Sequence, residues 1–129
     1  TYGIGVGLDQ LFGQGVIIGS SSTDNAKVAE ALAVTRSEWA RMAAEGPTQA
    51  ELDDAVAFLT GNLPLQFTDS RRIAGTLLAL RRNNRPRDWL DTRAARLAAL
   101  TRAGSAALAA RLLDADKLAV AIAGQPEGV

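Results

Sequence analysis

The first residues of the chain alternate strictly between large apolar side chains and glycine, in the order Tyr2-Gly3-Ile4-Gly5-Val6-Gly7-Leu8. An alternation of period two predicts a β-strand, with the apolar side chains on one face and bare backbone on the other. Glycine weakens a strand, because it loses much backbone entropy on folding and has no side chain to pack. We therefore interpret this strand as the lining of a site, or of a tight contact, where another group approaches the main chain closely.

A second apolar segment, residues 15–20, follows a turn-like stretch at residues 9–14 and completes a predicted β-hairpin. Behind it, capping residues and glycine or proline breaks divide the chain into predicted helices. These are a first helix that ends near Glu45, a second capped by Thr48 and Glu51 and limited by Pro64, a third capped by Asp69 or Ser70, a fourth that holds Leu90, Leu97 and Leu100, and a fifth capped by Thr101.

Near the C-terminus the period returns to two, with Leu118, Val120 and Ile122 alternating with alanine, which predicts a further strand. Two strands, five helices and a strand favour an α+β fold, in which an antiparallel or mixed sheet carries the run of helices on one face. We expect residues 1–129 to form a single domain. Three strands make a thin sheet for five helices, so we expect further strands upstream of Thr1.

The chain contains no histidine and no cysteine. This excludes from it a histidine general base, a Ser-His-Asp triad, a Cys-His pair and a zinc held by histidine or thiolate. Catalysis by this chain would have to rest on carboxylates, lysine, tyrosine or serine. Because the sequence opens within a predicted strand and its one methionine is Met42, we expect a processed product or a part of a longer protein.

The charges balance overall but are unevenly placed. Residues 1–70 carry three basic and nine acidic residues, residues 71–111 carry ten arginines and two aspartates, and the tail carries one lysine and three acids. The densest basic cluster, residues 81–87, has no interleaved aromatic residue beyond the nearby Trp89 and matches no nucleic-acid motif, so we interpret it as solvated surface or a contact between lobes. No apolar run approaches the roughly 20 residues of a membrane helix. We expect neither a nucleic-acid nor a membrane partner.

Two further patterns favour ordinary structure over a ligand site. The glycines of residues 13–19 superficially resemble a nucleotide-binding fingerprint, but they fall between and within predicted strands, so no phosphate cradle before a helix is predicted. Glu51, Asp53 and Asp54 are close neighbours on a predicted helix, where such positions point apart. A solvated face is therefore favoured over a paired acid and base.

Several short motifs stand in a characteristic order along nearly the whole chain: Thr1-Tyr2-Gly3 before the glycine-rich hairpin, Gly46-Pro47-Thr48 before Glu51-Leu52, Leu63-Pro64-Leu65, Asp88-Trp89-Leu90 before Thr101, and the run from Asp116 to Pro126. In this order and spacing they resemble the closing section of the pitrilysin/insulinase-type zinc peptidases. The resemblance implies an α+β lobe that closes, with other lobes, around a peptide chamber.

In that family the zinc site, an inverted His-x-x-Glu-His motif with a distant glutamate, belongs to an N-terminal lobe, which a chain without histidine does not match. The chain is similar instead to the later, non-zinc lobe. There an arginine and a tyrosine near the start of a glycine-rich strand hold the substrate backbone. The tyrosine corresponds to Tyr2, whereas the arginine would fall before Thr1. The resemblance thus implies no catalytic or metal-binding residue here, Tyr2 as a substrate-binding residue, and zinc in a partner lobe or subunit.

A tyrosine phenol can donate one directed hydrogen bond to a peptide carbonyl, although Tyr2 also suits an ordinary half-buried strand position. The main prediction is a non-catalytic, substrate-holding lobe whose partners are a zinc-binding lobe or subunit, a peptide, and further copies or subunits in an oligomer. The alternatives are an interaction lobe without peptidase activity, like core subunits of respiratory assemblies, and a free-standing helical adaptor. The compartment stays open between a bacterial periplasm and cytoplasm.

Overall fold

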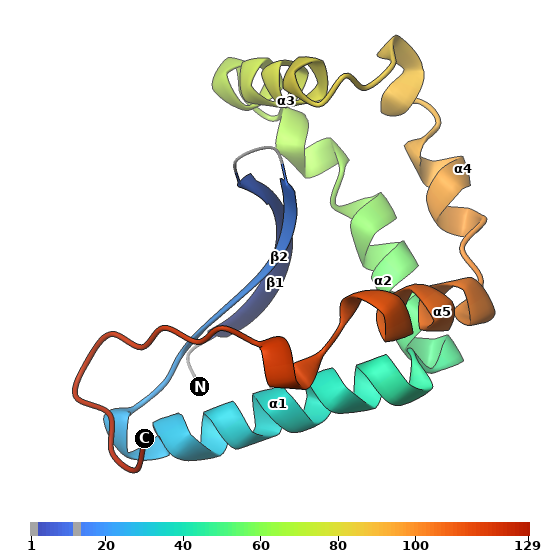
Figure 1. Ribbon diagram of the computed structural model, residues 1–129. Helices are drawn as coiled ribbons and strands as arrows, with labels where there is room; N and C mark the ends of the chain where they lie inside the picture. Colours follow the sequence, from blue (N-terminus) through green and yellow to red (C-terminus); the bar gives the residue numbers. More distant parts are fainter. Residues whose placement is uncertain (1–2, 12–13) are drawn as a thin grey trace. The chain divides into compact units, whose positions relative to one another are not determined.

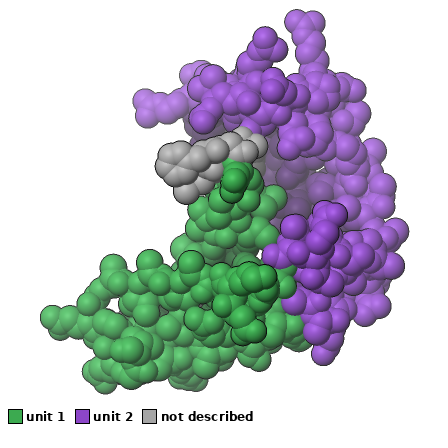
Figure 2. All heavy atoms as spheres, in the orientation of Figure 1, with its two compact units in different colours: residues 1–41, 113–129 green, residues 42–112 purple. Residues whose placement is uncertain are grey.

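The protein is described by a computed structural model that covers residues 3–11 and 14–129. In these residues two strands are followed by five α-helices, with short 3-10 turns between some of them (Figure 1). The predicted α+β class is confirmed. The chain divides into two compact units, one of residues 1–41 and 113–129 and the other of residues 42–112 (Figure 2). That all 129 residues form one domain stays a prediction.

The first unit begins with the β-hairpin that the glycine alternation predicts. β1 (Gly3–Leu11) pairs antiparallel with β2 (Gln14–Ser22), and the two strands form a two-stranded sheet (Figure 1). The register places Gly3 opposite Ser22 and Leu11 opposite Gln14. Period-two patterning therefore set both the hairpin and the face on which each side chain lies.

A single long helix follows the hairpin. After a 3-10 turn at Asn25–Lys27, α1 spans Val28–Glu45, so the predicted end at Glu45 is confirmed. Gly46 follows with φ +69°, and its amide donates to the carbonyl of Met42 at 3.0 Å. A glycine in this left-handed conformation is a common end of an α-helix, because the lack of a Cβ removes the steric penalty.

The second unit holds the remaining helices, and side-chain caps begin three of them, α2, α3 and α5. They are α2 (Gln49–Gly61), α3 (Ser70–Arg82), α4 (Arg93–Ala98) and α5 (Arg102–Leu112), with 3-10 turns at Pro64–Phe67 and Arg87–Trp89. The capping box that begins α2 is present, and Asp69 Oδ1 accepts from the Arg72 amide at 2.9 Å at the start of α3. Thr101 Oγ1 accepts from the Gly104 amide at 3.1 Å, as the predicted cap of α5 requires.

The predicted fourth helix is shorter than expected. Leu90 lies before α4 and Leu100 after it, so of the three leucines only Leu97 lies in that helix. Thr92 Oγ1 bonds back to the Asp88 carbonyl at 2.9 Å, and the Leu100 amide bonds to the Leu97 carbonyl three residues back. These local bonds compete with the helix at both ends, because they satisfy backbone groups in tighter turns.

Two arginines fix α4 alongside α2. The guanidinium of Arg93, at the start of α4, donates to the carbonyl of Leu59 near the end of α2. Arg102, the first residue of α5 and four residues beyond the end of α4, donates from Nε to the carbonyl of Pro47, just before α2, at 3.0 Å. The two helices therefore run antiparallel. Leu52 on α2 is the one hydrophobic side chain that is buried in the described part of the chain, with 8% of its surface exposed.

The strand predicted over Leu118, Val120 and Ile122 is wrong for this structure. A 3-10 turn at Ala115–Lys117 leads into an extended backbone, with Leu118 at φ −69° and ψ 110°, but the described residues place no strand here. Alternation provides two faces, yet a strand forms only where a neighbouring strand accepts and donates its backbone hydrogen bonds. The described sheet contains β1 and β2 alone, and the tail is held instead by the Glu127 amide, which donates to the Asn25 carbonyl at 3.1 Å.

Candidate functional site: an open glycine face on the hairpin

The glycine side of the hairpin is open. The register sets Gly3 opposite Ser22, Gly5 opposite Ser20 and Gly7 opposite Ile18, and directly opposed residues share one face of a sheet. A Cβ built on Gly3, Gly5 or Gly7 would meet no atom within 4 Å. On this face the space directly above the three glycines is therefore open among the described residues.

The start of β1 and the end of β2 together border a shallow hollow. It measures about 360 Å³ and is lined by Gly3, Ile4, Gly5 and residues 20–22. The three serines at residues 20–22 can both donate and accept hydrogen bonds, and glycine leaves the backbone accessible. The hollow thus combines polar groups with room for main chain, a combination that suits a peptide better than a large apolar ligand.

The opposite face of β1 is apolar and exposed. Ile4, Val6 and Leu8 keep 70%, 65% and 84% of their surface accessible. The register places Val6 opposite Gly19, and a Cβ on Gly19 would lie 3.8 Å from Val6 Cγ2. Three neighbouring apolar side chains that stay in water are unfavourable for an isolated unit, so this face is suited to cover by another surface.

Tyr2, the residue that the sequence singles out for substrate binding, lies outside the described residues. Its neighbour Gly3 is described and borders the hollow. The role of Tyr2 therefore stays a prediction. The structure describes the hollow that begins at the next residue, Gly3.

The acidic residues on α2 have structural partners. Glu51 Oε2 accepts from the Thr48 amide at 2.7 Å, and Asp53 Oδ1 accepts from Gln49 Nε2 at 2.8 Å. No group of three or more histidine, cysteine, aspartate or glutamate side chains that could hold a metal occurs among the described residues. With no histidine or cysteine in the sequence either, the residues of this chain do not fit a zinc site.

Several arginines have roles that the sequence analysis missed. The guanidinium carbon of Arg96 lies 3.4 Å from the ring centroid of Trp89, and that of Arg85 lies 4.3 Å from it. Arg96 also donates to the Trp89 carbonyl. The sequence did contain a signal for these cation–π contacts. Arginines stand four residues before and seven residues after Trp89, close enough along the chain to stack on its ring around a turn.

The tail of the chain contains one electrostatic pair with shifted pKa values. Lys117 Nζ lies 2.9 Å from Asp114 Oδ2. The hydrogen bond from Lys117 lowers the pKa of Asp114, and the Asp116 amide, which donates to Asp114 Oδ1 at 3.1 Å, lowers it further. The same hydrogen bond raises the pKa of Lys117. The pair closes a 3-10 turn away from the glycine face, so it has a local structural role.

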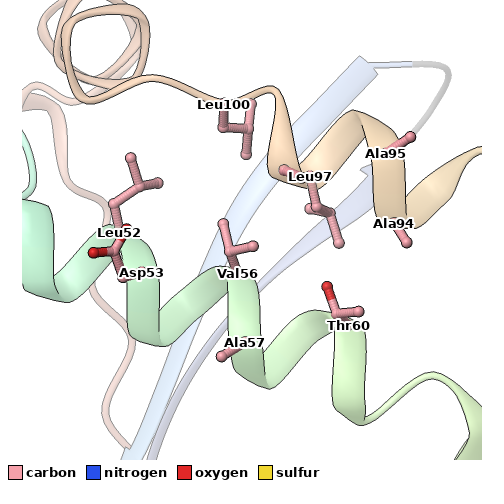
Figure 3. A pocket seen from close by; sticks show the side chains of 10 residues that line it. Leu52, Asp53, Val56, Ala57, Thr60, Ala94, Ala95, Leu97 and Leu100 are labelled. Carbon is pink, nitrogen blue, oxygen red and sulfur yellow. The ribbon is translucent and has the colours of Figure 1, made fainter.

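A second hollow lies between α2 and α4. It measures about 580 Å³, and apart from Asp53 and Thr60 its lining is apolar (Figure 3). Val56 and Thr60 point from α2 toward α4, and Leu97 points back toward α2 (Figure 3). With one charged residue in its lining, this hollow lacks the convergent polar groups of a catalytic site.

None of the helices in the described residues combines the length and the apolar character needed to cross a membrane. No curated protein and no solved structure matches the chain. A family model described as "Peptidase M16 inactive domain" matches residues 1–59, which include β1, β2, α1 and most of α2. The match begins at the glycine-rich hairpin, where the resemblance to pitrilysin-type peptidases also begins. Residues 1–59, somewhat less than half of the chain, therefore match the inactive, C-terminal domain of the M16, or pitrilysin-type, peptidases.

Proposed function

We propose that this chain is a non-catalytic lobe that holds an extended peptide in the chamber of a pitrilysin-type zinc peptidase. The observation that carries the proposal is the open glycine face of β1, which falls inside the segment that matches the inactive domain. The zinc belongs to another lobe or subunit, because the residues of this chain do not fit it. The chain contributes binding and orientation of the substrate.

An extended peptide can bind to such a hairpin through its main chain. A two-stranded sheet has two edges with unpaired N–H and C=O groups, and a peptide that adds a strand to an edge satisfies them without regard to its side chains. Gly3 and Gly5 leave the face beside that edge free of side-chain bulk. Ser20 and Ser22, opposite them, supply hydroxyl groups for further hydrogen bonds.

The proposal gives Tyr2 a positioning role. Its phenol would donate to a carbonyl of the bound peptide and hold the scissile bond in a fixed place relative to the metal of the other lobe. Holding the reacting groups in one geometry lowers the barrier without any chemistry by this chain. The effect should appear in turnover as well as in binding.

The test uses the full-length protein together with its zinc-binding lobe or subunit and a quenched fluorescent peptide. Tyr2→Phe removes one hydroxyl and keeps the ring, so we expect kcat/KM to fall by about tenfold, which corresponds to the loss of one directed hydrogen bond. Gly5→Val fills the glycine face and is expected to raise KM. Gly75→Val is the control, because a Cβ on Gly75 also meets nothing within 4 Å but lies on α3. Unchanged peptide turnover in both hairpin variants would refute the proposal.

The exposed apolar face of β1 favours a second candidate, an interaction lobe without peptidase activity. Ile4, Val6 and Leu8 would then dock onto another subunit. In this case Val6→Asp should abolish co-purification with the partner, and Tyr2→Phe should change neither assembly nor peptide turnover. The two candidates therefore differ in the result for Tyr2→Phe.

A further inference from the structure

The face of the second unit that holds the α2–α4 hollow has an apolar centre. Val56 and Leu97 face each other across the hollow, and Leu100, which borders one end, keeps 50% of its surface exposed (Figure 3). Leu52 and Asp53 lie at the same end as Leu100. Thr60, Ala94 and Ala95 form the other end, as the antiparallel course of α2 and α4 requires.

The chain segments next to the two ends of the hollow have opposite charge. Residues 45–54, at the start of α2, contain four acidic residues and no basic one. The other end is preceded by residues 81–87, which contain four arginines and no acidic residue, and which lead through the 3-10 turn into α4. Because α4 runs antiparallel to α2, the acidic and the basic segments are kept apart by the length of α2, roughly 20 Å at 1.5 Å per residue.

Part of this charge is left without an ion pair among the described residues of the unit. The ion pair shown within the described residues 42–112 joins Arg72 to its near neighbour Asp69 at 3.2 Å. Arg82, Arg87 and Asp54 have no ion-pair partner among the described residues, and all three are exposed. The hollow therefore lies between an acidic and a basic segment of the chain, and each segment has an exposed charged side chain without an ion pair among the described residues.

We propose that this face binds a second copy of the chain in an isologous dimer, with the α2–α4 hollows of the two copies facing each other across a two-fold axis. An isologous interface brings the same patch of both copies together, so the patch has to be complementary to itself. A two-fold rotation sets the acidic end of each copy against the basic end of the other. Each dimer therefore contains two equivalent contacts between an acidic and a basic end. The apolar centres then cover one another and lose contact with water.

Nucleic acid fits the basic end less well. Single-stranded nucleic acid is held by aromatic side chains on which bases stack, and the nearby aromatic ring, Trp89, is already contacted by Arg85 and Arg96. The acidic residues at the other end of the same face would repel phosphates. A second copy pairs the acidic and the basic end at the same time. The proposed dimer does not depend on the proposed peptide-holding role.

Sedimentation equilibrium of the full chain over a range of protein concentrations, at low and at physiological salt, tests the proposal. We expect a reversible monomer–dimer equilibrium that weakens with salt, since exposed charges are screened. Asp53→Arg and Arg87→Glu each turn two attractive contacts per dimer into repulsive ones, so each variant alone should dimerise about tenfold more weakly. Arg111→Glu is the control, because this exposed arginine at the end of α5 makes the same charge change away from the hollow.

An equimolar mixture of Asp53→Arg and Arg87→Glu gives the sharpest result. In a mixed dimer one contact is native and the other pairs the introduced arginine with the introduced glutamate, so dimerisation should return to the wild-type level. Far-UV circular dichroism of each variant establishes that it folds. Monomeric wild-type protein at every concentration, a mixture that stays monomeric, or an equal effect of Arg111→Glu would overturn the proposal. So would a labelled single-stranded oligonucleotide that binds wild type at low salt but not Arg87→Glu.

Discussion

Thr48 and Glu51 each bind the backbone amide of the other residue. Glu51 Oε2 accepts from the Thr48 amide at 2.7 Å, and Thr48 Oγ1 accepts from the Glu51 amide at 3.2 Å. This capping box satisfies two amides at the start of α2 that no helical carbonyl can reach. Because α2 carries Leu52 and one wall of the α2–α4 hollow, the cap also fixes where that wall begins.

Removing the cap should destabilise the second unit. Thr48→Ala leaves the Glu51 amide without its acceptor, and we expect the free energy of unfolding to fall by about 1 kcal/mol, the usual contribution of an N-cap. Thr48→Ser keeps a hydroxyl in place and is expected to retain most of the stability. Urea unfolding followed by circular dichroism measures both. Equal stability of the alanine and serine variants would contradict a capping role.

Gly46 should not tolerate a side chain. Its φ is +69°, and a Cβ there would lie 2.4 Å from the Cβ and 2.7 Å from the Cα of Ala106. Gly46→Ala should therefore lower the free energy of unfolding by about 2 to 4 kcal/mol, through the left-handed conformation and the steric overlap together.

Gly75→Ala should change the free energy of unfolding in the opposite direction to Gly46→Ala. Gly75 lies inside α3, and a Cβ on it meets nothing within 4 Å. Alanine has the higher helix propensity, so this variant should be more stable by roughly 0.5 to 1 kcal/mol. Thermal unfolding of the two variants side by side measures the contrast, and a loss of stability in both would show that the close approach to Ala106 is not the cause.

The stack of Arg96 on Trp89 should contribute measurably to the loop before α4. Arg96→Gln removes the guanidinium from the ring and weakens the bond to the Trp89 carbonyl, and we expect a loss of about 1 kcal/mol in the free energy of unfolding. Arg111→Gln, at an exposed arginine at the end of α5, should change it by less than about 0.5 kcal/mol. A double-mutant cycle with Trp89→Leu isolates the coupling. A coupling energy near zero would contradict the stack.

The pair of Asp114 and Lys117 predicts a pH dependence of the turn at Ala115–Lys117. The hydrogen bond from Lys117 lowers the pKa of Asp114 in the folded chain, so the ionised carboxylate stabilises the turn above the ordinary aspartate pKa. That contribution is lost as the pH falls through the lowered value. The pKa of Lys117 is raised, so its contribution is present below the ordinary lysine pKa and is lost as the pH rises through the raised value.

NMR titration of the Asp114 carboxyl carbon checks this prediction. In Lys117→Gln the carboxylate loses its first partner, and the pKa of Asp114 should rise toward the ordinary value while the Asp116 amide still holds it partly down. Ser105→Gln introduces the same side chain on α5 and should leave the titration unchanged. A pKa of Asp114 that does not move in Lys117→Gln would show that the lysine is not the cause.

Much of the local structure could be predicted because its signals lie within a few residues. Alternation over residues 2–8 predicted β1, the pair of Thr48 and Glu51 predicted the start of α2, and Gly46 predicted the end of α1. Each of these depends on backbone geometry and on hydrogen bonds between near neighbours. The glycine face could be predicted for the same reason, since a side chain that is absent from the sequence is absent from the surface.

The sequence by itself determined the hairpin, the helix caps and breaks, and the lack of histidine and cysteine as zinc ligands. The tertiary structure decided which extended segment has a strand partner, so that β1 and β2 pair while Leu118, Val120 and Ile122 do not. It also decided that Arg93 at the start of α4 and Arg102 at the start of α5 donate to carbonyl groups of Leu59 on α2 and Pro47 just before it. The physical reason is range: caps and periodicity act over a single turn, whereas strand pairing and arginine contacts need atoms that only folding brings from distant parts of the chain.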